Sequence, residues 1–290
     1  MKNLLIRLLS IIFKSIDTLL CQLSIKRPIV VVYIDGGICS QMLQYLQGQY
    51  YAECGIDVYY DDLWFQTNGK DQFGNMSRDF ELTEMWPNLK YQRISKWKRK
   101  WYLIFFKANR MNHDRLPEPD TIKHSIYLNG YWDLPEETYN NLFCKYFNQH
   151  TSNIPQSSLK QPCQDVVGVH VRRGDLAKGD NPYYGGVTDN YFIRAIEFCN
   201  EKFVPKNYIF LSDEPDWVEQ NICLHMKLPY VIVRGNKAWE DLWLLAQCPV
   251  IVASQGSFGK VAAKLNPNAA LIQCDNEFAI RGRANTWLIK

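Results

Sequence analysis

Two kinds of segment alternate along the second half of the chain. Continuous apolar runs of four to six residues, typical of strands buried on both faces, are separated by stretches with apolar residues at every third or fourth position, typical of amphipathic helices. The predicted strands are 166–171, 208–211, 230–233, 250–253 and 270–273. The predicted helices are 189–203, 216–223, 238–248 and 257–265. This alternation predicts a parallel sheet covered by helices on both faces.

The first half of the chain begins with the same alternation and then becomes irregular. An apolar strand at 29–34 precedes a helix at 41–54 and a strand at 56–60. The pattern then predicts no regular element until a strand at 122–128 and a helix at 135–147. These elements favour a second α/β unit of the same kind.

A polar segment containing prolines, at 150–162, separates the two halves and is typical of a linker. We therefore predict a helix at 1–27, an N-terminal Rossmann-like domain at 28–150, a linker at 151–164 and a C-terminal domain at 165–290. A chain of 290 residues is long enough for two modest domains. The predicted architecture is α/β, with two Rossmann-like domains facing each other across a cleft.

The first 27 residues combine an apolar helical pattern with charges. Leucine and isoleucine recur at helical spacing, while Arg7, Lys14 and Asp17 interrupt every apolar stretch well short of the ~20 residues that cross a bilayer. A basic amphipathic helix of this kind is suited to a membrane interface. A helix packed on the body of the protein is the alternative, and the lack of a small-residue cleavage site disfavours a signal peptide.

The net charge of +3 hides an uneven distribution along the chain. Residues 90–115 carry nine Lys and Arg against the single Asp114, and they include Trp97 and Trp101. Cations beside aromatic residues favour an anionic membrane surface, although the same composition fits single-stranded nucleic acid or a helix that covers its own core. The low overall charge argues against a dedicated nucleic-acid binder. We predict peripheral membrane binding and no nucleic-acid partner.

Nine cysteines are widely spaced along the chain and form no Cys-x-x-Cys pair. Neither a zinc ribbon nor a thioredoxin-type redox site is therefore predicted. Several of these cysteines lie in apolar runs, where cysteine behaves as a small buried side chain. The odd total and wide spacing of the cysteines favour a reducing compartment over a disulfide-bonded secreted protein.

The sequence VVGVHVRRGD at 166–175 is the strongest chemical signal. A buried strand ends near His170 and is followed by Arg172, Arg173 and Asp175. Ligands of open α/β sheets bind at the carboxyl ends of strands, where two guanidinium groups offer bidentate donors to a phosphate or diphosphate. A surface ion-pair cluster is the alternative interpretation of the same residues.

Two further turns are candidates for backbone contact with a ligand. Gly36 and Gly37 lie between a predicted strand and a helix, and the turn at 254–258 opens another helix whose N-terminal amides suit a phosphate. The first turn lacks a complete Gly-x-Gly-x-x-Gly sequence, so no dinucleotide site is predicted there. Asp241 is a candidate acceptor for a base or sugar N–H, or else a plain charge near a helix start.

Four segments together resemble the α-1,2-fucosyltransferases of glycosyltransferase family 11. They are GGICSQMLQY, VHVRRGD, IFLSDEPDWV and EDLWLLAQC, and the resemblance covers roughly residues 29–275. The His-x-Arg-Arg-x-Asp element is similar to one in the α-1,6- and protein O-fucosyltransferases as well. The resemblance implies a GT-B-like fold and GDP-fucose as the donor.

The resemblance also implies roles for individual residues. His170 and Asp241 would contact guanine, and Arg172 would hold the β-phosphate with support from Arg173 and Asp175. The remaining implied residues are Ser257 and Phe258 at the diphosphate turn and Gly36, Gly37 and Gln41 in the acceptor-side loop.

The chemistry expected of such a site needs a cation and a base. Breaking a sugar–diphosphate bond develops negative charge on the leaving phosphate, which Arg172 would stabilise. The chain contains no Asp-x-Asp pair of the kind that holds a nucleotide-bound metal, so an inverting mechanism without metal or cofactor is predicted. Inversion needs a base for the acceptor hydroxyl, and Asp180 lies where related fucosyltransferases place an acidic residue.

The predicted activity is transfer of fucose, with an α-1,2 linkage, to a galactoside-type acceptor. The acceptor would be an oligosaccharide or a lipid-linked glycan in bacterial surface polysaccharide synthesis, and the enzyme would be cytoplasmic and peripheral at the inner face of the plasma membrane. The sequence departs from the family pattern at two turns, where GG-x-GNQ is replaced by GGICSQ and SSFSWW by GSFGKV. A different GDP-sugar on the same fold and a non-catalytic nucleotide-sugar-binding membrane protein are the open alternatives.

Overall fold

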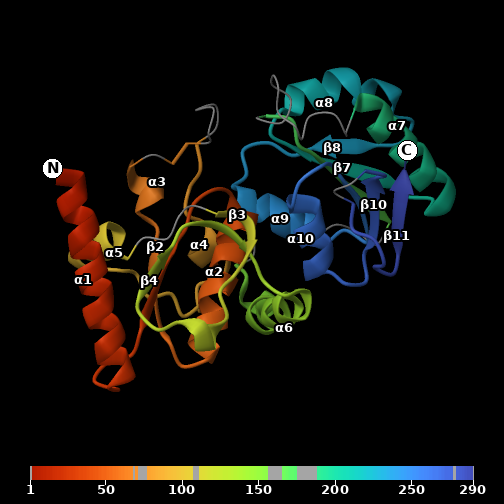
Figure 1. Cartoon of the computed structure of the whole chain (residues 1–290). Helices are drawn as coiled ribbons and strands as arrows, with labels where there is room; N and C mark the ends of the chain where they lie inside the picture. Colours follow the sequence, from red (N-terminus) through yellow and green to blue (C-terminus); the bar gives the residue numbers. More distant parts are fainter. Residues whose placement is uncertain are drawn as a thin grey trace. The chain divides into compact units, whose positions relative to one another are not determined.

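The computed structural model describes residues 2–67, 69–70, 77–106, 111–155, 165–174, 188–276 and 279–289. These residues form two compact units, the first made of residues up to 70 and 78–154 and the second of Ser77 and the residues from Pro155 onward (Figure 1). Each unit contains a parallel sheet with helices. The predicted α/β class is confirmed.

The second unit is built on six strands that are parallel throughout. In chain order they are β6 (Val166–Val171), β7 (Asn207–Ser212), β8 (Tyr230–Ile232), β9 (Val250–Ala253), β10 (Ala270–Cys274) and β11 (Thr286–Ile289). The helices are α7 (Asp189–Lys202), α8 (Pro215–Asn221), α9 (Ala238–Ala246) and α10 (Phe258–Leu265).

The spatial order of these strands is β11-β10-β9-β6-β7-β8. The chain therefore starts in the middle of the sheet, adds β7 and β8 on one side, and then crosses to add β9, β10 and β11 on the other. This is the doubly wound order of dinucleotide-binding folds, in which the strand order reverses between the first strand and the fourth. Here the reversal lies between β6 and β9, which are hydrogen-bonded neighbours.

Close helix–strand packing surrounds this reversal. A Cβ atom added to Gly168 in β6 would lie 2.7 Å from Cys248 Sγ and 2.8 Å from Leu245 Cδ1. A Cβ atom added to Gly259 in α10 would lie 2.4 Å from the Cβ atom of Ala253 in β9. Both distances are too short for a side chain, so glycine at these positions lets the helices lie directly on the two central strands.

The first unit has a three-stranded parallel sheet in the order β2-β1-β4. Its strands are β1 (Ile29–Tyr33), β2 (Asp57–Asp61) and β4 (Ile126–Leu128), and a separate parallel pair joins β3 (Met111–Arg115) to β5 (Gly130–Asp133). The helices are α1 (Lys2–Gln22), α2 (Ile38–Glu53), α3 (Leu63–Thr67), α4 (Leu82–Met85), α5 (Lys96–Phe105) and α6 (Glu136–Tyr146).

The prediction that the chain is irregular between the strand at 56–60 and residue 122 was wrong, because α3, α4, α5 and β3 lie there. The helices α3 and α4 are five and four residues long, too short to show a 3.6-residue period. The strand predicted at 122–128 is shorter and begins at Ile126, and a 3-10 helix at Asn148–Asn153 enters the predicted linker. The strand β11 was not predicted at all.

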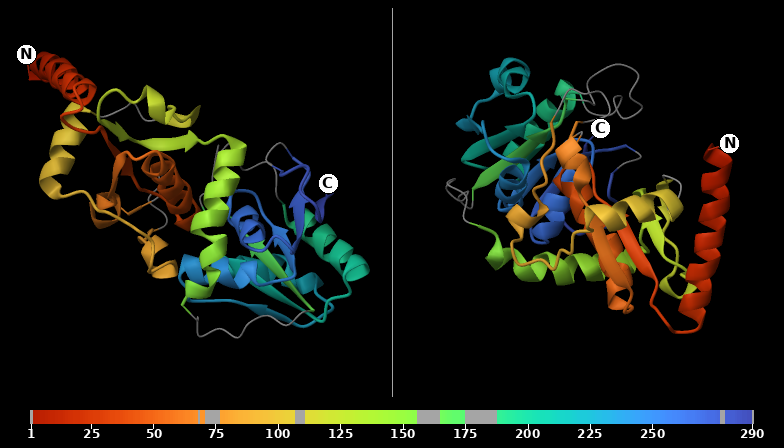
Figure 2. Two further views of the ribbon diagram at one scale, coloured as in Figure 1. Left: turned by 90° about the horizontal axis from the view of Figure 1, so that it is seen from below. Right: turned by 90° about the vertical axis from the view of Figure 1, so that its left-hand side faces the viewer.

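Helix α1 packs against α5 in the first unit, and the two lie side by side in both views of Figure 2. The Phe13 ring centroid is 4.6 Å from that of Trp101 and 4.7 Å from that of Phe105. Farther along α1, the buried Asp17 accepts a hydrogen bond of 2.6 Å from the Ser125 backbone N–H and pairs with Lys26. None of the described helices is long and apolar enough to cross a membrane.

Candidate functional site at the strand-order reversal

The candidate site lies where β6 and β9 end, at the reversal of strand order. The Ser254 backbone N–H donates to the His170 carbonyl oxygen at 3.0 Å, and the Arg172 backbone N–H donates to Ser254 Oγ at 3.0 Å. These two bonds fasten the segment after β9 to the segment after β6. Ligands of doubly wound sheets bind at such a point.

His170 is buried and uncharged. Its ring stacks on Phe258 with 4.5 Å between centroids and an interplanar angle of 18°. Burial, with a smaller contribution from the charge of Arg172, lowers the pKa of His170 to about 3. Ser254 Oγ lies 3.1 Å from His170 Nδ1, so Nδ1 is hydrogen-bonded to the turn after β9.

Arg172 is held by Asp213, which follows the neighbouring strand β7. One carboxylate oxygen of Asp213 pairs with the Arg172 guanidinium, and the other accepts the Arg173 backbone N–H at 2.9 Å. The side chains of Arg172 and Asp213 are 16% and 8% exposed. A largely buried carboxylate therefore fixes both the guanidinium and the backbone beside it.

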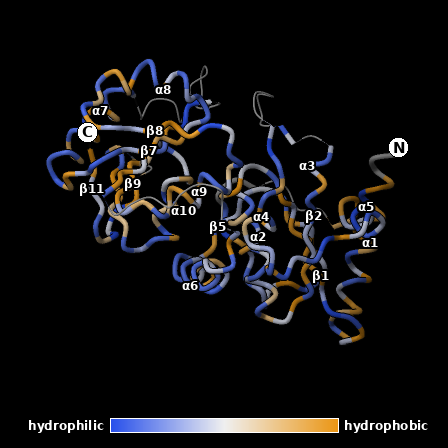
Figure 3. Tube along the Cα trace, turned by 180° about the vertical axis from the view of Figure 1, so that it is seen from behind, coloured by the Kyte–Doolittle hydropathy of each residue, from blue (hydrophilic) through white to orange (hydrophobic). Residues whose placement is uncertain are grey.

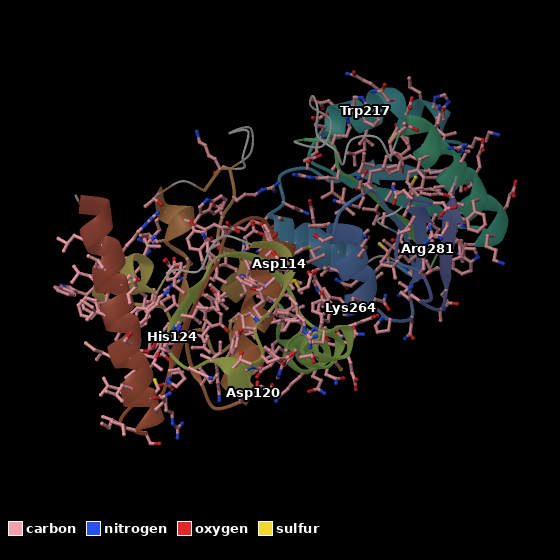
Figure 4. The ribbon with its side chains drawn as sticks, viewed as in Figure 1. Asp114, Asp120, His124, Trp217, Lys264 and Arg281 are labelled. Atoms are coloured by element: carbon pink, nitrogen blue, oxygen red, sulfur yellow. The ribbon has the colours of Figure 1, made fainter. Side chains whose placement is uncertain are left out.

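Arg173 is turned to a different set of partners. Its guanidinium lies 3.7 Å from the centroid of the Trp217 ring and donates to Glu214 at 3.0 Å. Trp217 projects from α8, as Figure 4 shows. These contacts suit the supporting role that the resemblance implies for Arg173.

Asp213 and Glu214 were missed as site residues by the sequence analysis. Both belong to the IFLSDEPDWV segment, and both directly follow β7. Their position directly after a predicted strand made them candidates, because carboxyl ends of parallel strands meet at one edge of a sheet, but only the strand order of the structure places β7 beside β6.

The turn after β9 contains the predicted diphosphate residues. Ser254 and Gln255 are buried, and Gly256 has φ +98°, a value that favours glycine. Ser257 is exposed at the start of α10, and Phe258 is half-buried against His170. Exposed backbone at the start of α10 beside a buried histidine fits the approach of an anion.

Asp241 lies in the first turn of α9. Its carboxylate accepts a hydrogen bond of 2.9 Å from Asn236 Nδ2. Burial raises the pKa of Asp241 to about 6, the Asn236 hydrogen bond opposes this, and the neighbouring Glu240 adds to it. The carboxylate is thus a strong hydrogen-bond acceptor that loses its charge just below neutral pH.

The predicted acceptor-side loop follows β1 in the first unit. Gly36 has φ +77° and Gly37 is the extended residue that precedes α2. Gln41 is fully buried: its Nε2 donates to the carbonyls of Gly36 and Asp79 at 3.2 and 2.9 Å, and its Oε1 accepts the backbone N–H groups of Glu81 and Leu82. Gln41 shapes this loop through backbone contacts.

The predicted residues Asp175 and Asp180 lie outside the described residues. The structure therefore brings together His170, Arg172, Arg173, Ser257 and Phe258 at one edge of the second sheet, adds Asp213, Glu214 and Ser254 to them, and places Asp241 on α9.

The second unit is a doubly wound α/β sheet with two arginines at its strand-order reversal, which is where sheets of this topology bind nucleotides and other ligands. The family model of "Glycosyl transferase family 11" matches residues 70–278. The chain belongs to this family and is a glycosyltransferase of the fucosyltransferase-like kind, which confirms the resemblance.

Two relatives illustrate the match. An alpha-1,2-colitosyltransferase of Escherichia coli is 22% identical over 261 residues, which cover 79% of this chain and 85% of that protein. The galactoside alpha-(1,2)-fucosyltransferase 1 of Aotus azarae is 32% identical over 103 residues, 34% of this chain and 28% of that protein. The second match therefore spans less than a third of the fucosyltransferase.

Two solved structures are similar at lower identity. A mutant of Arabidopsis thaliana FUT1 in complex with GDP is 15% identical, covers 89% of this chain and 73% of that chain, and has a TM-score of 0.44. POFUT1 in complex with GDP is 10% identical, covers 87% of this chain and 99% of that chain, and has a TM-score of 0.42.

Proposed function

We propose that this glycosyltransferase transfers fucose from GDP-fucose to a galactoside-type acceptor with an α-1,2 linkage. The observation that carries the proposal is the largely buried cluster of Arg172, His170 and Asp213 at the strand-order reversal. The reaction would invert the sugar carbon without a metal and would contribute to a bacterial surface polysaccharide. The names of the family and of the E. coli and Aotus relatives support this class of reaction.

The proposed chemistry assigns a task to each part of the cluster. Arg172 stabilises the negative charge that develops on the leaving β-phosphate, and its pairing with Asp213 orients the guanidinium before the substrate arrives. The other ring nitrogen of His170 would hydrogen-bond guanine. Asp241 accepts N–H bonds from the same base.

The acceptor hydroxyl must lose its proton as the new bond forms. We assign this step to Asp180 as the general base. The acceptor would be an oligosaccharide or a lipid-linked glycan near the Gly36–Gly37 turn. Arg172 and Asp180 are thus the two proposed catalytic residues.

The proposal is tested by incubating the protein with GDP-fucose and a β-galactoside and identifying the products by mass spectrometry. Equal amounts of GDP and of a fucosylated, 2-linked product are expected. A donor of colitose is the second arm, because the E. coli relative that covers most of this chain is a colitosyltransferase. Tight GDP-fucose binding with no turnover on a broad acceptor panel would show a non-catalytic binder and overturn the proposal.

Donor affinity is expected to fall below about pH 6. Asp241 has a raised pKa of about 6, so the carboxylate that accepts guanine N–H bonds is charged at pH 7 and protonated at pH 5. The dissociation constant should rise about tenfold for each pH unit below 6, as measured by calorimetry between pH 5 and 8.

GDP-fucose is the appropriate ligand for this titration because its diphosphate, esterified at both ends, has no ionisation near pH 6. His170 stays neutral throughout the range. The Asp241→Asn variant should bind more weakly at pH 8 and show a flat profile. A flat profile in the unaltered protein would remove Asp241 from the donor site.

We also propose that the enzyme works in the cytoplasm as a peripheral protein of the inner face of the plasma membrane. The support is the basic and apolar character of α1 and the basic and aromatic character of α5. At that position a lipid-linked glycan would be held close to the acceptor-side unit.

A further inference from the structure

We infer that α1 and α5 together form one docking face for an anionic lipid surface. This docking face consists of the exposed apolar side chains of α1 and of the Leu23–Ile25 turn, with those of α5 and its lysines. The inference deepens the proposed membrane location and rests on it, but it is independent of which sugar is transferred.

The inner side of α1 is occupied by the protein itself. Phe13 packs on Trp101 and Phe105, Ser10 Oγ donates to the Phe105 carbonyl oxygen at 2.7 Å, and Asp17 is buried against Ser125. A helix that merely covers a core would bury this side and present polar residues to water. The packed-helix alternative therefore predicts a polar outer side.

The outer side of α1 is apolar instead. The large apolar side chains of this outer side and of the following turn are each 47–67% exposed, and they recur at helical spacing. They are Leu5, Leu8, Ile11, Ile12, Ile16, Leu19, Leu23 and Ile25. Figure 3 shows apolar and polar residues alternating along the trace of α1. The fold holds α1 in place and leaves this stripe without a protein partner among the described residues.

Helix α5 extends the same docking face. Trp97, Trp101 and Ile104 are 83%, 39% and 49% exposed. Of the fifteen large apolar side chains exposed among the described residues, eleven belong to α1, its following turn or α5. Such a concentration marks an interaction surface, since single exposed apolar residues are normally scattered.

The positive charge of α5 favours an anionic lipid surface as the partner. The helix carries four cations and no acidic residue. Arg99 forms an ion pair with the buried Asp61, and Lys98 Nζ lies 4.5 Å from the centroid of the Tyr59 ring. Lys96 and Lys100 are exposed beside Trp97. Apolar and tryptophan side chains flanked by lysines fit the interface of an anionic bilayer.

A second copy of the chain is the competing occupant. In a symmetric dimer the same patch faces itself, so the lysines of α5 would be brought near their own copies in a desolvated contact. Interface cores are depleted of charge, and like charges across an interface are unfavourable. The charge pattern therefore favours lipid.

The test is sedimentation of the full chain with vesicles, without substrate. The unaltered protein should bind vesicles of phosphatidylcholine with phosphatidylglycerol at least ten times better than vesicles of phosphatidylcholine alone. The triple variant Leu8→Glu, Ile12→Glu and Leu19→Glu should lose at least tenfold in binding. Each of Lys96→Ala and Lys100→Ala should lose about fivefold, the factor that corresponds to ~1 kcal/mol per cation.

The matched control is Leu224→Glu with Val231→Glu, which places acidic groups on side chains 77% and 60% exposed in the second unit. It should bind vesicles normally. All variants are checked by circular dichroism and by turnover with a soluble acceptor, which should be unchanged in the triple variant. This separates failure of docking from failure of the proposed reaction.

Two results would overturn the inference. One is equal and weak binding of the unaltered protein and the triple variant to both vesicle types. The other is a dimer in solution, measured by light scattering, that the triple variant converts to a monomer while vesicle binding is absent. The second result would assign the docking face to another copy of the chain.

Discussion

Replacing Arg172 with alanine is expected to lower kcat/KM by about 100- to 1,000-fold. A preorganised charged donor at the site of developing charge typically contributes about 3–4 kcal/mol to the transition state. The side chain is 16% exposed and fixed by Asp213, so little reorganisation is needed when the phosphate leaves. The measurement is GDP release at saturating acceptor, with donor binding followed separately by calorimetry.

Two further variants separate the specific role of Arg172 from the loss of any arginine and from the loss of charge alone. Arg234→Ala removes an exposed arginine that pairs with Asp216 at 2.7 Å and Glu219 at 3.2 Å in the same unit, and it should leave turnover within twofold of normal. Arg172→Lys keeps the charge but loses the planar guanidinium with its paired N–H donors. Its kcat/KM should lie between those of Arg172→Ala and Arg234→Ala. An Arg172→Ala enzyme with normal turnover would refute the proposed role.

Asp213→Ala is expected to lower kcat/KM by about 10- to 100-fold, although Asp213 is not proposed to touch the transferred sugar. Its two oxygens hold the Arg172 guanidinium and the Arg173 backbone N–H, and misplacement of a catalytic group by about 1 Å can cost 100-fold. Loss of the carboxylate also removes a counter-charge from a largely buried arginine, which is destabilising.

Positioning is separated from plain structural damage by a double-mutant cycle. Because Asp213 acts through Arg172, the double variant should be barely slower than Arg172→Ala alone. Asp213→Asn keeps an acceptor for the Arg173 N–H and should recover part of the turnover. Asp216→Ala, on the exposed Arg234 pair, is the matched control. Fully additive losses would show that Asp213 acts independently of Arg172.

The second unit could be predicted well because its elements are specified locally. The strands β6 and β9 are buried along their whole length, so they appear in the sequence as unbroken apolar runs. The position of Arg172 at a strand end followed from that pattern. The role of Asp213 did not, because strand order is a property of the assembled sheet and only that order places β7 beside β6.

The first unit was predicted poorly between residues 62 and 121 because distant contacts specify its elements. The start of α4 is capped by Gln41, some forty positions earlier in the chain. Helix α5 is tied to the sheet by Arg99, whose partner Asp61 also accepts the Tyr127 hydroxyl at 2.5 Å. Bonds between residues so far apart in the chain do not change the local pattern of apolar and polar residues, so that pattern could not predict these helices.

The contact between Asp17 and Ser125 has a practical consequence for producing the protein. Truncation of residues 1–27 would be the usual way to make a membrane-binding enzyme easier to purify. Here it would strip the cover from Trp101 and Phe105 and leave the Ser125 N–H without its acceptor. A shortened chain would therefore lose the apolar outer side of α1 but expose the aromatic surface of α5 that α1 covers. The untruncated chain with acidic residues on the outer side of α1 would keep that surface covered.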